Sequence, residues 1–396
     1  MPSTDVPWPL ARQLAHDAAQ PSRVVSLPLS QALGATLADD LVALTALPPF
    51  DTVTMDGWAV CGRPPWRLLG RQLAGDPVTR VRPGQAVETA TGAQLPRGAD
   101  AVLRRERGTV EQQGADRWVL ADASPGARHD VRPAGEEAGP GEVLLPRGTV
   151  VTPPVLGLAA AAGHDSLLVH PRPTVDVLVL GDELLTAGLP GDGRVRDSLG
   201  PQAPGWVSAA GAHLASLVAV RDEAEPTRDA LAACSADLVV STGGTARGPV
   251  DQVHPALRDL GAVLLVDRVA VRPGHPMVLA RLGDGRLFVG LPGNPLAAAV
   301  AFASLAVPAL QGSRGVGLPD LPSATSTKDL TAPEHAHRLL PARVVGDGAR
   351  RLVTAVHHAG PAMLRGLSLA THLVVVPPGG AGSGSDLALV ELPWVG

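Results

Sequence analysis

The chain has 396 residues, of which 45% are hydrophobic, and a formal net charge of −5 at pH 7. This length exceeds what one hydrophobic core usually organises, so we expect several domains. The negative charge and dispersed arginines give no general attraction to nucleic acid or to an anionic membrane, and Cys61 and Cys234 are too few and too distant for a zinc cluster or a disulfide framework.

Targeting signals are not visible in the sequence. Met1 to Gln20 contains charges and prolines without a continuous apolar segment, so no signal peptide is expected. The longest apolar run, Leu296 to Leu310, is too short to span a bilayer. We therefore expect a cytoplasmic protein with neither a membrane nor a nucleic-acid partner.

The N-terminal part of the chain predicts two domains, one inserted into the other. Residues 1–45 predict an amphipathic helix, a short strand around Arg23–Leu27 and a second helix from Ser30 to Leu41. Residues 46–132 contain short extended pieces separated by Gly/Pro turns, which is typical of a small β-rich domain. Residues 133–170 return to a Gly-rich loop and a helix, so we expect 1–45 and 133–170 to form one discontinuous N-terminal domain.

The C-terminal part predicts two further domains. Residues 171–316 contain buried strands alternating with helical patterns, including one at 204–217, and this alternation predicts a central parallel α/β domain. Residues 317–396 contain several β-like runs without a convincing long helix, which predicts a small β-barrel domain.

Each predicted strand of the α/β domain ends in an unusual turn. These turns are Gly181-Asp182-Glu183, Thr242-Gly243-Gly244 and Gly290–Pro295. In doubly wound sheets, ligands bind beyond the carboxyl ends of strands, and glycines let backbone N–H groups approach phosphate oxygens. Any one of these turns alone could be an ordinary connecting loop, but the three together predict one pocket.

Asn294 is the only asparagine in the chain and lies in the third turn, before Pro295. The structural alternative is that Asn294 is simply a helix N-cap before a proline at the first helical position. Ser or Asp would serve equally well there, and both are plentiful in this sequence. We therefore favour a functional turn.

Charged residues near these turns suggest two kinds of chemistry. Glu183 and Asp251 are carboxylates suited to Mg²⁺, which is bound by a few carboxylates together with phosphate oxygens. Arg272-Pro273-Gly274-His275-Pro276 is a cationic turn in which Arg272 would bind oxyanions and His275 would contribute a donor. A plain turn with an incidental arginine explains the second pattern equally well.

Taken together, the motifs are similar to those of one known family, the molybdopterin molybdenumtransferases, which include bacterial MoeA and the gephyrin E-domain. The resemblance covers essentially the whole chain, and its motifs occur in the expected order: Pro48–Val60 with Pro-Pro-Phe-Asp and Met-Asp-Gly, Thr91–Val102, Gly135–Glu137, Gly181–Glu183, Thr242–Gly244, Arg272–Pro276 and Gly290–Pro295.

The resemblance implies an elongated four-domain homodimer with a central MogA-like domain. It implies that molybdate is inserted into the dithiolene of adenylylated molybdopterin, with Mg²⁺ assistance and release of AMP. The site would lie between the β-rich domain of one subunit, with Asp56 and Thr91, and the α/β domain of the other. The residues expected from the α/β domain are Glu183, Asp222, Gly243, Gly244, Asp251, Arg272, Pro273, Gly274, His275, Pro276, Pro292, Gly293 and Asn294.

The same resemblance implies roles for these residues. Glu183 and Asp251 would bind the metal with support from Asp222, Arg272 and His275 would meet oxyanion charge, and the glycine turns would hold phosphate and pterin. Arg343 would match an arginine of the family's last domain. Contacts with other cofactor-biosynthesis proteins or with apo-molybdoenzymes are also expected.

Several positions depart from the family pattern. Leu180 replaces a threonine, Ala246–Pro249 lacks a hydroxyl and a carboxylate, Arg272 and His275 replace lysines, and Ala297 and Pro361 replace serines. These departures leave two interpretations open: a working transferase with a remodelled oxyanion pocket, or a non-catalytic paralogue that binds molybdopterin or nucleotide as a scaffold or carrier. The sequence does not distinguish molybdate from tungstate.

Overall fold

The computed structural model describes residues 5–245, 252–346 and 351–394. The chain forms two compact units. Unit 1 comprises Met1–Val25, Gly34–Ala38 and Val169–Gly396, and unit 2 comprises Ser26–Leu33 and Asp39–Leu168. The finer division into four domains stays a prediction.

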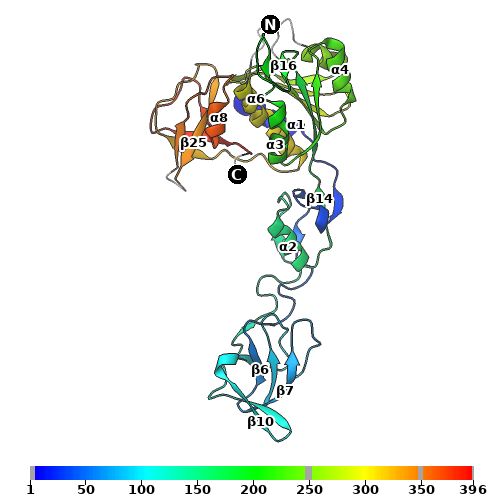
Figure 1. Ribbon diagram of the computed structural model, residues 1–396, viewed down its shortest axis with the longest axis vertical. Coiled ribbons are helices and arrows are strands. Elements are labelled where there is room, and N and C mark those ends of the chain that lie inside the picture. The colour runs from blue at the N-terminus through cyan, green and yellow to red at the C-terminus, as the bar shows by residue number, and fades with distance from the viewer. Residues whose placement is uncertain (1–4, 246–251, 347–350, 395–396) are drawn as a thin grey trace. The chain divides into compact units, whose positions relative to one another are not determined.

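Unit 2 is built around a six-stranded sheet with the order β10-β11-β7-β8-β6-β9 (Figure 1). Neighbouring strands are antiparallel except for the parallel β7–β8 pair. The side chains of Trp58 and Trp66 are buried against one face of this sheet and supply much of its small core. The sheet strands are β6 (Gly57–Cys61), β7 (Trp66–Gln72), β8 (Gln85–Thr89), β9 (Ala101–Arg104), β10 (Thr109–Gln113) and β11 (Asp116–Leu120).

The remaining elements between residues 25 and 170 are short, and strand β3 among them belongs to unit 1. The helical ones are η1 (Leu29–Gln31), η2 (Arg105–Arg107) and α2 (Pro153–Ala161), and the strands are β2 (Val25–Pro28), β3 (Thr36–Leu37), β4 (Leu41–Val42), β5 (Thr52–Val53), β12 (Val131–Arg132), β13 (Val143–Leu145) and β14 (Ser166–His170).

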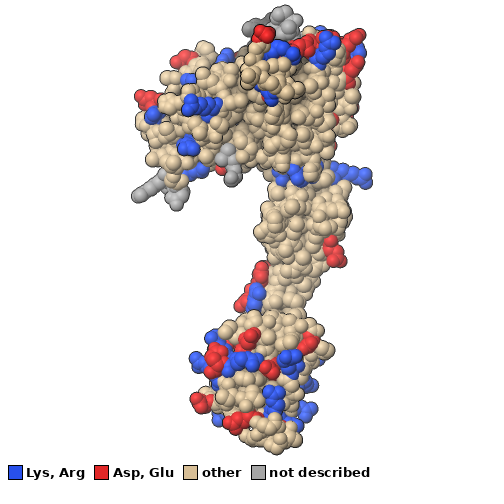
Figure 2. Space-filling view, viewed as in Figure 1, with Lys and Arg blue, Asp and Glu red and all other residues tan. Residues whose placement is uncertain are grey.

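The surface of unit 2 carries both signs of charge. On the face drawn in Figure 2, basic and acidic side chains alternate over the β-rich sheet. Several charged side chains of unit 2 are paired, as in the Arg67–Asp116 and Arg105–Glu88 ion pairs at 2.8 and 2.7 Å. Exposed pairs of this kind contribute little to stability, about 0–1 kcal/mol each.

Unit 1 contains a second six-stranded sheet, with the order β18-β15-β19-β23-β22-β20 (Figure 1). All strands are parallel except β22, which is antiparallel to both of its neighbours. The predicted α/β class is therefore confirmed, with one antiparallel strand added. The strands are β15 (Thr174–Leu180), β18 (His213–Val220), β19 (Leu238–Thr242), β20 (Val263–Asp267), β22 (Val278–Arg281) and β23 (Leu287–Leu291).

Helices cover this sheet and share its core. In α1 the buried residues Trp8, Ala11, Ala15 and Ala18 recur at the three- and four-residue spacing of one helix face. The Trp8 indole N–H donates to the Ser304 hydroxyl at 2.9 Å, which ties α1 to a central helix. The helical elements are α1 (Trp8–Ala18), η3 (Gly200–Gln202), α3 (Ala203–Ala209), α4 (Ala224–Ala233), α5 (Val253–Asp259), α6 (Pro295–Ala301), the π-helical η4 (Phe302–Ala306), α7 (Val307–Ser313) and α8 (Arg365–Leu369).

The segments α6, η4 and α7 form one continuous helical stretch, Pro295–Ser313. Within the described part of the chain it is the one helix long and apolar enough to cross a membrane by length and composition, and it is longer than the apolar run seen in the sequence. Its apolar window is 83% buried inside the structure, as expected of a core helix.

The C-terminal part of unit 1 is a closed barrel, as predicted. Its strands follow the order β25-β26-β24-β28-β27, and β27 pairs back with β25. Strand β21 (Val269–Arg272) joins β1 (Val6–Pro7) to the barrel by pairing with β25. The barrel strands are β24 (Ser323–Ser326), β25 (His337–Val345), β26 (Leu352–Ala355), β27 (His372–Val376) and β28 (Asp386–Glu391).

Two predicted helices are wrong, and a glycine explains each error. Between Ser30 and Leu41 the structure has only η1 and short strands, because Gly34 has φ +79°, a left-handed conformation that interrupts a helix. The helix predicted at 204–217 ends at Ala209, Gly211 follows with φ +77°, and the chain then enters β18.

Candidate functional site

A cavity of about 840 Å³ lies in unit 1 at the carboxyl ends of four parallel strands. The segments that follow β15, β18, β19 and β23 contribute Gly181–Glu183, Asp222, Gly243–Thr245 and Pro292–Pro295 to its lining. The small parallel ladder β16–β17 (Leu184–Leu185 and Val195–Arg196) adds another wall. The predicted convergence of three turns is therefore observed, with a fourth strand end added.

The loop after β15 places Glu183 at the cavity. Gly181 has φ +144°, and a Cβ there would lie 2.8 Å from the Glu183 Oε2 atom, so the carboxylate lies over a position that only glycine fits well. The Val195 N–H donates to the Glu183 carbonyl at 2.9 Å. The ladder therefore holds the backbone that carries this carboxylate.

The loop after β19 presents two unsatisfied hydroxyls. Gly243 and Gly244 both have positive φ, +85° and +67°, and the Gly243 N–H is already bonded to the Leu291 carbonyl at 2.9 Å. Thr242 and Thr245 are each 3% exposed, and their hydroxyl oxygens have no hydrogen-bond partner among the described residues. A buried polar group without a partner costs roughly 1–3 kcal/mol, so these hydroxyls would be satisfied by a polar ligand.

The turn after β23 does not use Asn294 as a side-chain cap. Asn294 occupies the N-cap position of α6, but its side chain makes no cap hydrogen bond, and the residue lines the cavity. The Pro361 carbonyl instead accepts hydrogen bonds from the N–H groups of Leu296 and Ala297, at 2.9 and 3.3 Å. The N-cap alternative is thus incorrect for the Asn294 side chain, and two helix N–H groups that would otherwise be available to an anion are already occupied.

The cavity lining contains several carboxylate groups whose oxygens could bind a metal ion. The carboxylates are Asp182, Glu183, Asp197 and Asp222, and the Asp222 N–H lies 3.4 Å from the Asp182 Oδ1 atom. In the described part of the chain, these groups form no ready-made cluster of three metal ligands. A set of carboxylates at a ligand cavity nevertheless suits Mg²⁺, which keeps several waters and binds substrate phosphates. The predicted metal ligand Asp251 lies outside the described residues.

Of the Arg272–Pro276 turn, only Pro276 lines the α/β cavity among the described residues. Arg272 is exposed and donates to its own neighbour, the Val271 carbonyl, at 3.0 Å, while Pro273 and Gly274 are buried. The His275 Nε2 atom lies 2.7 Å from the Asp5 carboxylate, so this ring contacts the N-terminal segment.

Arg343 lies in the barrel strand β25 rather than at the cavity. It is exposed and donates from Nε to the Leu369 carbonyl at 2.8 Å.

Asp56 and Thr91 belong to unit 2 and lie together there. The Asp56 Oδ1 atom accepts hydrogen bonds from the Thr91 N–H at 2.8 Å and from its hydroxyl at 3.1 Å. These two bonds lower the pKa of the Asp56 carboxyl below its ordinary value. The two predicted residues from distant motifs therefore form one hydrogen-bonded pair.

Sequence reasoning missed several residues of the α/β cavity. Arg196 and Asp197 come from a stretch without helical or strand periodicity, and Thr245 follows a glycine pair whose pattern indicates a role for the backbone only. The apolar run that precedes Asp222 overlaps the helix predicted at 204–217 and is strand β18 in the structure.

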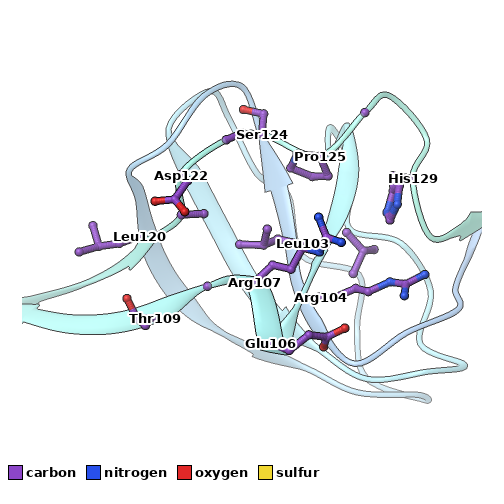
Figure 3. A pocket seen from close by; sticks show the side chains of 15 residues that line it. Leu103, Arg104, Glu106, Arg107, Thr109, Leu120, Asp122, Ser124, Pro125 and His129 are labelled. Carbon is purple, nitrogen blue, oxygen red and sulfur yellow. The ribbon is translucent and has the colours of Figure 1, made fainter.

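Unit 2 has a cavity of its own, of about 760 Å³, bounded by β9, η2, and the loop after β11 (Figure 3). None of the predicted site residues lines it. Arg104 makes two hydrogen bonds to Asp130, at 2.7 and 2.9 Å, and the His129 Nδ1 atom lies 2.8 Å from the same carboxylate. Two of its charged lining groups, Arg104 and His129, are therefore paired within the protein.

Comparisons with known proteins agree along most of the chain. Residues 7–163 match the family described as MoeA N-terminal region (domain I and II), and residues 176–312 match the one described as probable molybdopterin binding domain. Molybdopterin molybdenumtransferase 2 of Mycobacterium tuberculosis is 32% identical over 380 residues, covering 90% of this chain and 91% of the relative. The molybdopterin molybdenumtransferase of Bacillus subtilis is 30% identical over 392 residues, covering 92% and 91%.

Solved structures show that the fold is also similar to that of MoeA proteins. Two structures of the molybdopterin biosynthesis MoeA protein of Pyrococcus horikoshii align with TM-scores of 0.77 and 0.73. Each alignment covers 98% of this chain and at least 99% of the other, at 22% sequence identity.

Proposed function

The chain belongs to the molybdopterin molybdenumtransferase family of molybdenum cofactor biosynthesis, and we propose that it inserts molybdate into the dithiolene of adenylylated molybdopterin with release of AMP. The observation that carries this proposal is the convergence of four strand ends on one cavity of about 840 Å³. Such a cavity at the carboxyl edge of a parallel sheet is where α/β folds bind nucleotide-like ligands.

The carboxylates of the cavity support a role for Mg²⁺. Glu183 and Asp222, with Asp182 beside them, would hold the ion, and Asp251 is the further ligand expected from the family motif. When bound, the ion would neutralise charge on the phosphate oxygens of the substrate.

The other lining groups are suited to binding and orienting the substrate. The Thr242 and Thr245 hydroxyls are hydrogen-bonding groups without partners in the described structure, and the exposed Asn294 amide lies across the turn after β23. Hydrogen bonds from these groups would fix the orientation of the pterin and phosphate groups, and orientation is a large part of catalysis of group transfer.

A non-catalytic scaffold that binds molybdopterin or nucleotide is the second candidate function. It is favoured by the contact of the Pro361 carbonyl with the Leu296 and Ala297 N–H groups, because Ala297 and Pro361 occupy positions where the family resemblance leads us to expect serine. Two hydroxyls are missing there, and the helix N–H groups beside them are occupied.

The experiment that separates the two candidates measures AMP release from adenylylated molybdopterin by the purified protein with Mg²⁺, with and without molybdate. Molybdate-dependent release supports the transferase. Tight binding of the substrate without release supports the scaffold. Repeating the assay with tungstate tests the selectivity for the oxyanion.

We also propose a cytoplasmic homodimer in which Asp56 and Thr91 of one subunit complete the site of the other, as the family resemblance implies. Mixing the inactive variants Asp56→Asn and Glu183→Gln tests this. Partial recovery of AMP release in the mixture supports a shared site, and no recovery contradicts it. Contacts with other cofactor-biosynthesis proteins or apo-molybdoenzymes would be tested by co-purification with the dimer.

A further inference from the structure

The charge of the α/β cavity is unbalanced. Its described lining contains four carboxylates, on Asp182, Glu183, Asp197 and Asp222, and a single cationic side chain, Arg196. An anionic substrate entering this cavity would meet mostly like charge, which raises its free energy unless cations compensate. Arg196 is therefore the one described protein group of the lining that can attract an oxyanion by its own charge.

The backbone next to Arg196 is held in place. Asp197 accepts hydrogen bonds through Oδ1 from the N–H groups of Leu199 and Gly200, each at 2.9 Å. A Cβ at Gly200 would lie only 2.2 Å from Asp197 Oδ2, so the close approach depends on glycine. The carboxylate of Asp197 is thus used to stabilise the turn that follows β17, and Arg196 lies at the end of this fixed strand.

The guanidinium of Arg196 makes little use of its donors within the protein. It is exposed, and its hydrogen bond from Nη1 to the Gly188 carbonyl is long, at 3.5 Å. No ion pair of Arg196 occurs among the described residues, although several carboxylates line the same cavity. A guanidinium carries five N–H donors in a planar fork that matches two oxygens of an oxyanion.

We propose that Arg196 binds a tetrahedral oxyanion of the substrate in this cavity and determines its affinity. This inference rests on the proposed function. The phosphate of the adenylyl group and molybdate share the required chemistry, because both present pairs of oxygens to the fork. Arg272, which the sequence suggested for this role, does not line the cavity among the described residues, and its guanidinium donates to the Val271 carbonyl.

The chain offers a matched control two residues away. Arg194 lies in the same segment, is exposed, and donates to the Leu184 carbonyl at 3.3 Å, but does not line the cavity. Arg194→Gln removes the same charge from the same region without removing a cavity group. Long-range electrostatic effects on an anion would therefore appear in both variants, and a direct contact only in Arg196→Gln.

The test uses the full-length protein with Mg²⁺ and measures binding of AMP and of molybdate by calorimetry. Arg196→Gln should weaken binding of the oxyanion in contact by about tenfold, Arg196→Lys by less, and Arg194→Gln by less than twofold, since a lysine keeps the charge and loses the fork. Weaker AMP binding identifies the phosphate as the partner, and weaker molybdate binding identifies molybdate.

Steady-state AMP release gives a second readout. The KM for the affected substrate should rise about tenfold in Arg196→Gln while kcat changes by less than about twofold, which a general loss of structure would not produce. Unchanged binding of both oxyanions, or an equal loss in Arg194→Gln, overturns the proposal, as does a wild-type protein that binds neither. A wild-type protein that binds the oxyanions without releasing AMP refutes the transferase and leaves the Arg196 comparison measurable.

Discussion

The two units contain cavities of similar volume and different chemistry. The cavity of unit 1 measures about 840 Å³ and that of unit 2 about 760 Å³. In unit 1 the Thr242 and Thr245 hydroxyls have no partner among the described residues. In unit 2 the Arg104 guanidinium and the His129 ring both contact Asp130.

Because the two volumes are similar, we use the unsatisfied groups rather than the volume to identify the ligand site. Hydrogen bonds and charges that are already paired stabilise the protein itself and leave little to exchange with a ligand. Buried groups without partners gain a hydrogen bond only when something binds. We therefore propose the unit 1 cavity as the substrate site and expect the paired groups that line the unit 2 cavity to affect stability.

The largest expected effect is a loss of activity, and it should occur for a substitution in the unit 1 cavity but not for the same substitution in the unit 2 cavity. Glu183→Gln should lower AMP release by at least about 100-fold, since losing one preorganised electrostatic contact to a reacting group typically costs roughly 10²–10³ in rate. Glu106→Gln makes the same change in the unit 2 cavity and should leave the rate within twofold. Equal losses in the two variants would remove the distinction between the cavities.

The next effect is on the stability of the α/β sheet. The Asp176 carboxylate is 4% exposed and accepts hydrogen bonds from the Ser216 hydroxyl and from the N–H groups of Ser235 and Ala236. Asp176→Ala leaves those three donors without their acceptor, one of them the buried Ala236 N–H, and we expect a loss of about 2 kcal/mol in the free energy of unfolding, measured by urea titration. Asp229→Ala, at an exposed ion pair with Arg228, should change it by less than about 0.5 kcal/mol.

The stability of unit 1 should depend on pH through the same Asp176 carboxylate. Burial raises the pKa of Asp176, but the hydrogen bonds from Ser216, Ala236 and Ser235 outweigh burial and hold the pKa below its ordinary value. Because the folded pKa is the lower one, the contribution is present above the unfolded pKa of about 3.9 and is lost as pH falls through the folded value. As the pH is lowered below about 4, the urea midpoint of unfolding should therefore fall less steeply in Asp176→Ala than in the wild type.

Much of the fold could be predicted because local sequence and tertiary structure agree. Strands β15, β19 and β23 are continuous apolar runs followed by glycine and polar residues, so both the strands and their functional ends were recognisable. Strand β18 was missed because it lies at the sheet edge, where Leu217 and Val218 stay exposed and the apolar pattern imitates a helix.

The site was predicted less completely because side-chain direction is a tertiary property. The sequence identified Arg272 as a cation near a turn, and nothing in the pattern showed that Arg196 would line the cavity instead. The N-cap position of Asn294 was also predictable, but the absence of a side-chain cap bond depends on the Pro361 carbonyl reaching α6 from a distant segment.

A smaller effect tests the role of Asn294 directly. Asn294→Ser keeps a good N-cap residue while shortening the side chain that lines the cavity. We expect a loss of about tenfold in AMP release, equal to about 1.4 kcal/mol, with a change in unfolding free energy below about 0.5 kcal/mol. Unchanged turnover together with unchanged stability would contradict a role in the cavity, because that is the result expected if Asn294 is only an N-cap that serine can replace.

The smallest expected effect lies in unit 2. Asp130→Asn removes the charge that pairs with Arg104 and contacts His129, and asparagine tolerates the positive φ of +55° at this position. The hydrogen bonds from Arg104 lower the pKa of Asp130, so the wild-type pair is lost only as pH falls through that lowered value. At pH 7 the variant should lower the unfolding midpoint of unit 2 by a few degrees.

Asp122→Asn is the matched control, because Asp122 is exposed, lines the same cavity and has no ion pair within the described ranges. It should leave the midpoint unchanged, and both variants should keep AMP release within about twofold of the wild type. If Asp130→Asn instead weakened AMP release while Asp122→Asn did not, the paired groups of unit 2 would take part in the reaction. The distinction between a binding cavity and a structural one would then have to be drawn on other grounds than pairing.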